Sequence, residues 1–206
     1  GAVDVEAGGA LTCVRVREGG QIRCFGAGSQ GQLGDGMRSA ASFMPVTVKD
    51  VSDAHALSIG ATHACAIVGT PHTLQCWGES SEDRLGSPTV EGHGPTAVRG
   101  LEGAIRVATG GAHSCAITHD SSLWCWGRAR EGQLGISGYD PVRTARRIGT
   151  LSELTAAPTA RGSGSPVHTG GEGGAAALVA TLTAPATRAI VTGADHVCAL
   201  GADGLV

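Results

Sequence analysis

Residues 110–135 read GGAHSCAITHDSSLWCWGRAREGQLG, and residues 60–86 read GATHACAIVGTPHTLQCWGESSEDRLG. In both stretches a glycine precedes a cysteine by five residues, and a Cys-Trp-Gly step and a closing Leu-Gly follow in the same order. The same spacing of Gly and Cys occurs twice more, in residues 8–13 (GGALTC) and residues 193–198 (GADHVC). Self-similarity of this kind indicates a repeat architecture, which decides the fold before single elements are considered.

The period of the repeat points to a β-propeller. The motif cysteines are spaced at 52, 50 and then 83 residues. Each unit contains short apolar runs bounded by Gly, Pro and Asp, which is typical of short antiparallel strands separated by turns. About fifty residues of this kind make one four-stranded propeller blade. A β-sandwich is the competing all-β fold, but it gives no reason for a repeat every fifty residues. We therefore predict an all-β fold, a β-propeller fragment of about four blades of four antiparallel strands.

The repeats predict that residues 1–206 form one partial propeller. The third interval between motif cysteines is longer than the others, which places an insertion at residues 152–186. This insertion is rich in Gly, Ala, Ser, Thr and Pro. We expect a flexible loop at residues 152–174, because apolar surface is too scarce there to offset the entropy of ordering. Residues 175–183 could form a strand. The repeats are expected at approximately residues 1–50, 51–100, 101–151 and, truncated, 187–206.

Six of the seven cysteines fall into pairs on predicted hairpins. Cys13 and Cys24 are eleven residues apart, and a two-residue turn at Glu18-Gly19 places them directly opposite each other. The second pair has the same separation, and the third pair, ten residues apart, suits a three-residue turn. Opposed residues lie close to the reach of a disulfide, although buried free thiols that pack as small hydrophobes are the alternative. The predicted bridges are Cys13–Cys24, Cys65–Cys76 and Cys115–Cys125.

The seventh cysteine, Cys198, has no counterpart within the sequence, since its expected partner position lies two residues past Val206. We expect it to be unpaired by truncation. Disulfides persist in oxidising compartments, so the pattern predicts an extracytoplasmic location (secreted, periplasmic or cell surface), although no signal is visible in the sequence. The separations of ten and eleven do not fit the spacing of zinc ligands, and we predict no metal.

The two stretches quoted first resemble repeats of the regulator of chromosome condensation family, in the cysteine-bearing form associated with bacterial secreted and surface proteins. The resemblance covers nearly the whole chain apart from residues 152–186. It implies a partial seven-bladed β-propeller, and hence an internal fragment of a longer protein. The family includes an exchange factor for a nuclear GTPase, β-lactamase inhibitors and receptor-like modules, and no function transfers residue by residue.

No catalytic motif is found, and we predict neither catalytic nor cofactor-binding residues and no cofactor. The chain lacks a Gly-x-Ser-x-Gly elbow and a phosphate-binding loop. His63, His113 and His196 recur three residues after the motif glycine, but a structural role, with each ring bonded to neighbouring backbone, accounts better for them than a ring of imidazoles. The remaining histidines share no spacing: His55, His72, His93, His119 and His168.

Charge and aromatic content narrow the candidate partners. A chain with a net charge of −3 attracts nucleic-acid phosphates only weakly, so we expect no nucleic acid as a partner. No stretch approaches the length of a membrane span. The basic cluster Arg143, Arg146 and Arg147 is a solvated loop or a binding patch. Trp124 has no aromatic counterpart in the other repeats, which makes it a possible binding residue.

These observations favour a non-catalytic binding or scaffold module, exported, that recognises a protein or a cell-surface polymer through loops on one propeller face. Function on loops of a rigid scaffold is the usual arrangement, and the loops that vary between repeats are residues 38–43, 87–94 and 138–147. The main alternative is a regulator of a small GTPase that resembles a guanine-nucleotide exchange factor. An enzyme with a site in the central channel is a weaker third possibility.

Overall fold

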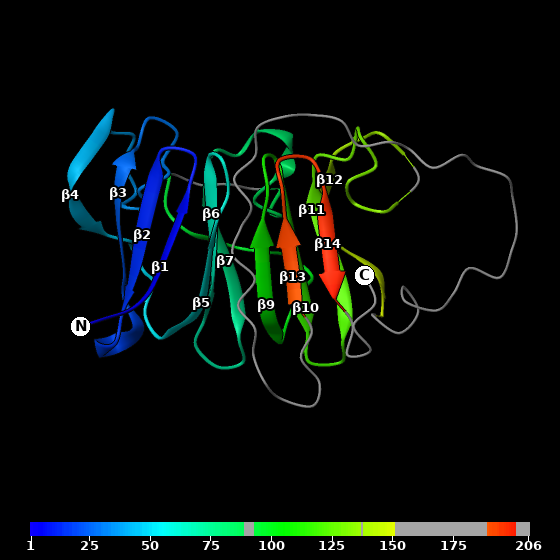
Figure 1. Cartoon of the computed structure of the whole chain (residues 1–206), viewed down its shortest axis with the longest axis horizontal. Helices are drawn as coiled ribbons and strands as arrows, with labels where there is room; N and C mark the ends of the chain where they lie inside the picture. The colour runs from blue at the N-terminus through cyan, green and yellow to red at the C-terminus, as the bar shows by residue number, and fades with distance from the viewer. Residues whose placement is uncertain (89–92, 137, 151–188, 201–206) are drawn as a thin grey trace, which may run out of the picture.

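The protein is built from antiparallel β-sheets that follow one another in chain order. The computed structural model describes residues 1–88, 93–136, 138–150 and 189–200. Within these residues there are three four-stranded sheets and one two-stranded sheet, each in sequential strand order. The three four-stranded sheets follow one another along the long axis of the molecule, and the β13–β14 hairpin overlaps the third sheet in this view (Figure 1). The predicted all-β propeller architecture is confirmed, with three complete blades and one hairpin of a fourth among the described residues.

The strands of each blade have the following bounds. Blade 1 consists of β1 (Ala2–Gly8), β2 (Leu11–Val16), β3 (Ile22–Ala27) and β4 (Ala41–Thr47). Blade 2 consists of β5 (Ala54–Ile59), β6 (His63–Val68), β7 (Thr73–Gly78) and β8 (Thr96–Ala97). Blade 3 consists of β9 (Ala104–Thr109), β10 (His113–Thr118), β11 (Ser122–Gly127) and β12 (Val142–Thr150). The fourth sheet pairs β13 (Ala189–Thr192) with β14 (Val197–Leu200).

The first strands of successive sheets stand next to each other. β1 contacts β5, β5 contacts β9, and β9 contacts β13. Two short 3-10 turns complete the described elements, η1 (Glu18–Gly20) and η2 (Ser81–Asp83). The insertion predicted at residues 152–186 lies outside the described residues. In the part of the chain that is described, no helix has the length and apolar character needed to cross a membrane.

The central hairpins have the predicted register, but one turn differs from expectation. Cys13 lies directly opposite Cys24, as the spacing requires. The two-residue turn expected at Glu18-Gly19 is wrong, because the 3-10 turn η1 closes the hairpin there instead. Gly19 adopts φ 68°, which a residue without a Cβ accepts at no steric cost. The carbonyl of Gly19 accepts a hydrogen bond from the Asp53 amide at 2.7 Å, so the wider turn also connects blade 1 to the start of blade 2.

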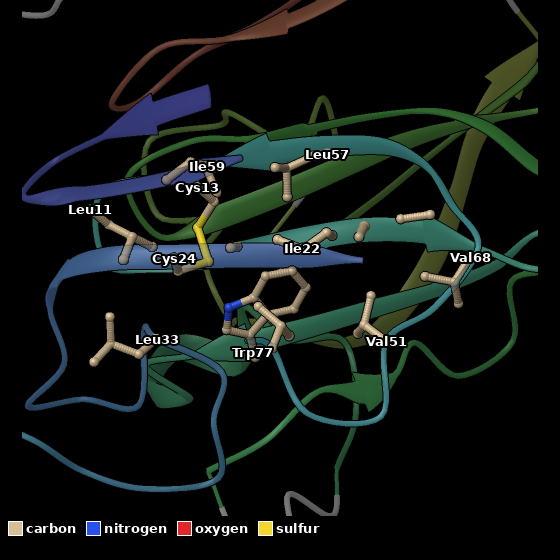
Figure 2. Packing of buried hydrophobic residues seen from close by; sticks show 14 residues of the cluster. Leu11, Cys13, Ile22, Cys24, Leu33, Val51, Leu57, Ile59, Val68 and Trp77 are labelled. Carbon is tan, nitrogen blue, oxygen red and sulfur yellow. A yellow bond between two sulfur atoms is a disulfide. The ribbon is translucent and has the colours of Figure 1, made fainter. Parts of the chain in front are cut away.

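The core of the molecule lies between blades. Trp77, fully buried on β7, joins the apolar cluster that contains the Cys13–Cys24 bridge of the preceding blade. Figure 2 shows its indole next to Cys24 and Ile22. The indole Nε1 donates a hydrogen bond to the carbonyl oxygen of Gln32 in blade 1, at 3.0 Å. The repeated tryptophan therefore joins neighbouring blades by apolar contact and by one directed bond.

The closing Leu-Gly of each repeat serves the same interface. Gly86 of blade 2 adopts φ 65°, and a Cβ at this position would lie 2.8 Å from Nε1 of Trp126 in blade 3. Trp126 is fully buried and donates from Nε1 to the carbonyl oxygen of Arg84 at 2.9 Å. Only glycine leaves the space that the next blade's indole occupies, and this explains why the Leu-Gly step recurs at the same distance from each cysteine.

Candidate functional site

The three predicted disulfides are present in the structure, each between directly opposed residues of a blade's two central strands. All six cysteines are at most 1% exposed. Each bridge contributes to the apolar cluster shared with the following blade, so the bridges strengthen the hairpins and also fill the seams. Cys198 is the one free cysteine of the described residues and is half-buried. Its predicted loss of a partner by truncation stays a prediction.

The recurring histidines His63 and His113 are buried between blades. His63 is fully buried, and its Nε2 lies 2.8 Å from the Ser114 hydroxyl of the next blade. Because that hydroxyl donates its proton to the carbonyl of Arg84 at 3.1 Å, it accepts from Nε2–H of His63. The predicted bond to neighbouring backbone is thus wrong in detail for His63, because its hydrogen-bond partner is the Ser114 side chain. The role is nevertheless structural, since no solvent reaches this Ser-His pair.

Burial lowers the pKa of His63 from 6.5 to about 3, with smaller contributions from the charges of Arg84 and His113. The unfolded chain binds a proton near pH 6.5, whereas the folded chain does not until about pH 3. His63 therefore contributes stability above pH 6.5 that is lost as the pH falls from 6.5 towards 3. Between pH 7 and pH 5 the loss from this residue is about 2 kcal/mol in the free energy of unfolding.

Urea denaturation at pH 7 and pH 5 measures this loss. The variant His63→Asn is expected to show a smaller drop in the free energy of unfolding than the wild type, because no group at position 63 titrates. His93→Asn is the control, since His93 lies outside this interface, and its drop should equal that of the wild type. Equal drops for the wild type and His63→Asn would contradict the assignment.

Trp124 and two of the three predicted arginines lie together on blade 3. On the β11–β12 ladder, Trp124 is opposite Arg147 and Cys125 is opposite Arg146. Arg147 Nε donates to the Ser122 hydroxyl at 3.0 Å. Arg143 does not join this group, because it lies further along β12 and faces Asp83 of blade 2 at 3.7 Å. The basic cluster of the sequence is thus split between two sites in the structure.

A hollow lies beside Trp124 at the seam between blades 2 and 3. It is framed by the turn before β7, by the chain between β8 and β9, and by the Trp124 side chain. The indole Nε1 of Trp124 is buried and has no hydrogen-bond partner among the described residues. The lining residues are Pro71, His72, Thr73, Val98, Gly100, Leu101, Glu102 and Trp124.

A second surface lies on the edge strand of blade 1, where residues 41–43 of the loop predicted at residues 38–43 belong to β4 instead. Phe43 is 95% exposed and Met44 is 73% exposed, both on β4, and Met37 in the loop before β4 is 58% exposed. We call these three side chains the β4 apolar patch. The sequence contained the apolar pair but gave no means to distinguish an exposed edge strand from a buried one, because burial of β4 depends on what packs against it.

The variable loop at residues 87–94 approaches the segment of blade 1 between β3 and β4. A Cβ placed on Gly31 of blade 1 would lie 3.1 Å from the Cβ of His93 in blade 2. The loop containing His93 therefore reaches the segment that precedes the β4 apolar patch. Residues 89–92 and 137 of the predicted binding loops lie outside the described residues. No group of three His, Cys, Asp or Glu side chains in the described ranges already has the arrangement of a metal site.

Comparisons with known proteins show which repeat family and which relatives this chain is similar to. Residues 104–133 match the family described as Regulator of chromosome condensation (RCC1) repeat. The chain is 31% identical over 160 residues to the human Probable E3 ubiquitin-protein ligase HERC6, covering 74% of this chain and 16% of that protein. It is also 31% identical over 145 residues to the RCC1 domain-containing protein RUG3, mitochondrial, of Arabidopsis thaliana, covering 68% of this chain and 32% of the relative. The chain therefore spans about a third or less of these relatives.

Solved structures agree on the fold. Prp20p from Saccharomyces cerevisiae is 16% identical with a TM-score of 0.64, over 75% of this chain and 40% of that one. Human WBSCR16 is 19% identical with a TM-score of 0.68, over 97% of this chain and 44% of that one. Residues 104–133 thus contain one RCC1-type repeat, and the blade topology and these likenesses show that the chain has a β-propeller fold similar to that of RCC1-like proteins.

Proposed function

We propose that this chain is a non-catalytic module that binds a partner protein through the β4 apolar patch and the neighbouring loops. The observation that carries the proposal is the exposure of Phe43 (95%) and Met44 (73%) on one edge strand. Exposed large apolar side chains are a feature of interaction sites, and aromatic residues and Met are enriched in protein interfaces. Other RCC1-like proteins support a protein partner, since the structure of Prp20p is described with its binding to Gsp1p and histones, and yeast RCC1 was solved with Kap60 bound.

Export is a further part of the proposal. Three buried disulfides in one chain support an oxidising compartment, because cytosolic thiols are kept reduced. We also propose that the chain belongs to the cysteine-bearing form of the repeat family, which is associated with bacterial secreted and surface proteins. A cell-surface polymer is the other extracytoplasmic ligand class, but the strongly apolar patch favours a protein.

We also propose that the described blades belong to a larger, seven-bladed ring. Val5 and Leu57 occupy equivalent positions on β1 and β5, each eight residues before the motif cysteine. Leu57 is 6% exposed, whereas Val5 is 64% exposed. The difference arises because blade 1 covers Leu57 while no described blade covers Val5. A preceding blade would bury Val5 in the same way.

Site-specific crosslinking tests the binding proposal. A photoreactive amino acid at position 43 of the full chain is expected to crosslink one protein from an extracytoplasmic extract, which is then identified and purified. Affinity for the purified partner is measured by calorimetry. The double variant Phe43→Ala/Met44→Ala is expected to bind at least about 30-fold more weakly, since interface hot spots contribute about 2 kcal/mol or more each.

The matched control is Phe43→Leu/Met44→Leu, which keeps the apolar surface and should bind within about 10-fold of the wild type. The proposal is wrong if the alanine variant binds as tightly as the wild type, or if position 43 crosslinks only to a second copy of this chain. An exchange-factor-like regulator is the second candidate. Accelerated release of labelled nucleotide from a small GTPase on addition of the chain would support that function instead.

A further inference from the structure

Three histidines without a common spacing in the sequence come together at the rim of blades 2 and 3. His55 lies at the start of β5, His72 in the β6–β7 turn and His119 in the β10–β11 turn. Nδ1 of His72 is 3.1 Å from Nε2 of His119, and the centre of the His55 ring is 5.1 Å from that of His72. All three side chains reach solvent, since His55 and His119 are exposed and His72 is half-buried. We call these residues the rim histidines.

We propose that the rim histidines bind a divalent transition-metal ion such as Zn²⁺, with His72 and His119 as the primary ligands. Two imidazoles on one tetrahedral Zn²⁺, with Zn–N bonds of about 2.0 to 2.1 Å, hold their nitrogens about 3.3 Å apart. The observed separation of 3.1 Å is close to this value. The two rings are also within 22° of parallel. A small tilt of the two rings directs both lone pairs at one point, and the ion replaces the shared proton.

His55 supplies the third ligand after rotation of its exposed side chain. The three donors do not converge as they stand, and no group of three His, Cys, Asp or Glu side chains among the described residues forms a metal site in this arrangement. The Asp53 carboxylate lies 3.7 Å from Nε2 of His55. A carboxylate on one ring nitrogen orients a histidine and leaves the other nitrogen for the metal. A rotation that keeps Asp53 beside Nε2 leaves Nδ1 of His55 as the ligand atom, and water completes the four-coordinate site.

The backbone at His72 presents its ring to the site. His72 adopts φ 64°, in the left-handed region that residues other than glycine rarely occupy. Such conformations persist where the surrounding structure holds them and cluster at ligand sites. The turn is held by the hydrogen bond from the His72 amide to the Gly69 carbonyl at 3.1 Å.

Calorimetry with ZnCl₂ alone tests the proposal on the full chain in a Cys198→Ser background, which removes the free thiol as a competing ligand. One saturable site is expected per chain. His72→Gln and His119→Gln are each expected to weaken Zn²⁺ binding at least about 10-fold, and Asp53→Asn about 10-fold through the loss of its orienting contact. His93→Gln, a histidine elsewhere on the molecule, is the matched control and should bind like the background.

Tryptophan emission gives an independent readout. Trp124 lines the same hollow as His72, so Ni²⁺ at the rim histidines is expected to quench its fluorescence, and Trp124→Phe is expected to abolish that part of the quenching. Circular dichroism establishes that each variant is folded. The proposal is overturned if no saturable Zn²⁺ binding occurs up to millimolar concentration. It is equally overturned if His72→Gln/His119→Gln binds Zn²⁺ as the background does, or if His93→Gln weakens binding to the same degree.

Discussion

Replacing Trp126 by alanine is expected to lower the free energy of unfolding by about 4 kcal/mol, the largest effect of any single substitution considered. Trp126 is fully buried and belongs to the apolar cluster that contains both Cys65 and Cys76 of the preceding blade. Its removal leaves a cavity in the seam, and the glycine-lined space at Gly86 cannot fill it. The loss also deletes the hydrogen bond to the Arg84 carbonyl. Guanidinium denaturation followed by circular dichroism measures the change.

Two further variants keep this prediction testable if Trp126→Ala does not fold. Trp126→Phe retains most of the apolar contact and removes only the directed bond. Trp126→Phe should lower the free energy of unfolding by less than Trp126→Ala does. Loss of the hydrogen bond should account for only about 1 kcal/mol, because the Arg84 carbonyl still accepts a hydrogen bond from the Ser114 hydroxyl. Trp124→Ala is the matched control on the same strand, where the side chain is only partly buried. Equal costs for Trp124→Ala and Trp126→Ala would contradict the expectation that the fully buried Trp126 contributes more to the seam than the partly buried Trp124.

Removal of the middle disulfide is expected to have the second largest effect. The double variant Cys65→Ala/Cys76→Ala should lower the free energy of unfolding by about 3 kcal/mol, because the bridge no longer restricts the conformations of the unfolded chain. Both cysteines are fully buried, at 0% exposure. The bridge packs in the same cluster as Trp126, so the double variant also loosens the contact between blades 2 and 3.

The control for the disulfide is Cys198→Ser, which alters the free cysteine and should change the free energy of unfolding by less than about 0.5 kcal/mol. Because Trp126 and the bridge share one cluster, their effects are not expected to add. The combined variant should differ from the sum of the separate losses by at least about 0.5 kcal/mol. Full stability of the double cysteine variant under oxidising conditions would contradict the role assigned to the bridge.

The strand pairing within each blade could be predicted from the sequence because it depends on local spacing. Cys65 and Cys76 are eleven residues apart, and a hairpin with that separation places them opposite each other. The same local rule produced the third pair at a separation of ten. The exact turn was less predictable, since η1 replaces the expected two-residue turn without changing the register.

The candidate sites could be predicted only in part. Trp124 stood out as an unmatched aromatic, and the structure places it opposite Arg147 on the neighbouring strand. Arg143, adjacent to the other arginines in the sequence, faces blade 2 instead. Of the β4 apolar patch, only Phe43 fell in a predicted binding loop, because the side chains of an edge strand are buried or exposed according to their neighbours in space.

The repeat in the sequence by itself determined the all-β blades, their number of residues, the hairpin register and the cysteine pairs. These features follow from turns and spacings within about fifty residues of chain. The tertiary structure alone decided which side chains meet across a seam. The rim histidines are the clearest case, because His72 and His119 are 47 residues apart in sequence and meet through the stacking of two blades. The seam between blades 2 and 3 likewise joins Trp126 of one repeat to Gly86 and the Cys65–Cys76 bridge of the preceding repeat. Its packing is therefore decided only when both repeats are folded side by side.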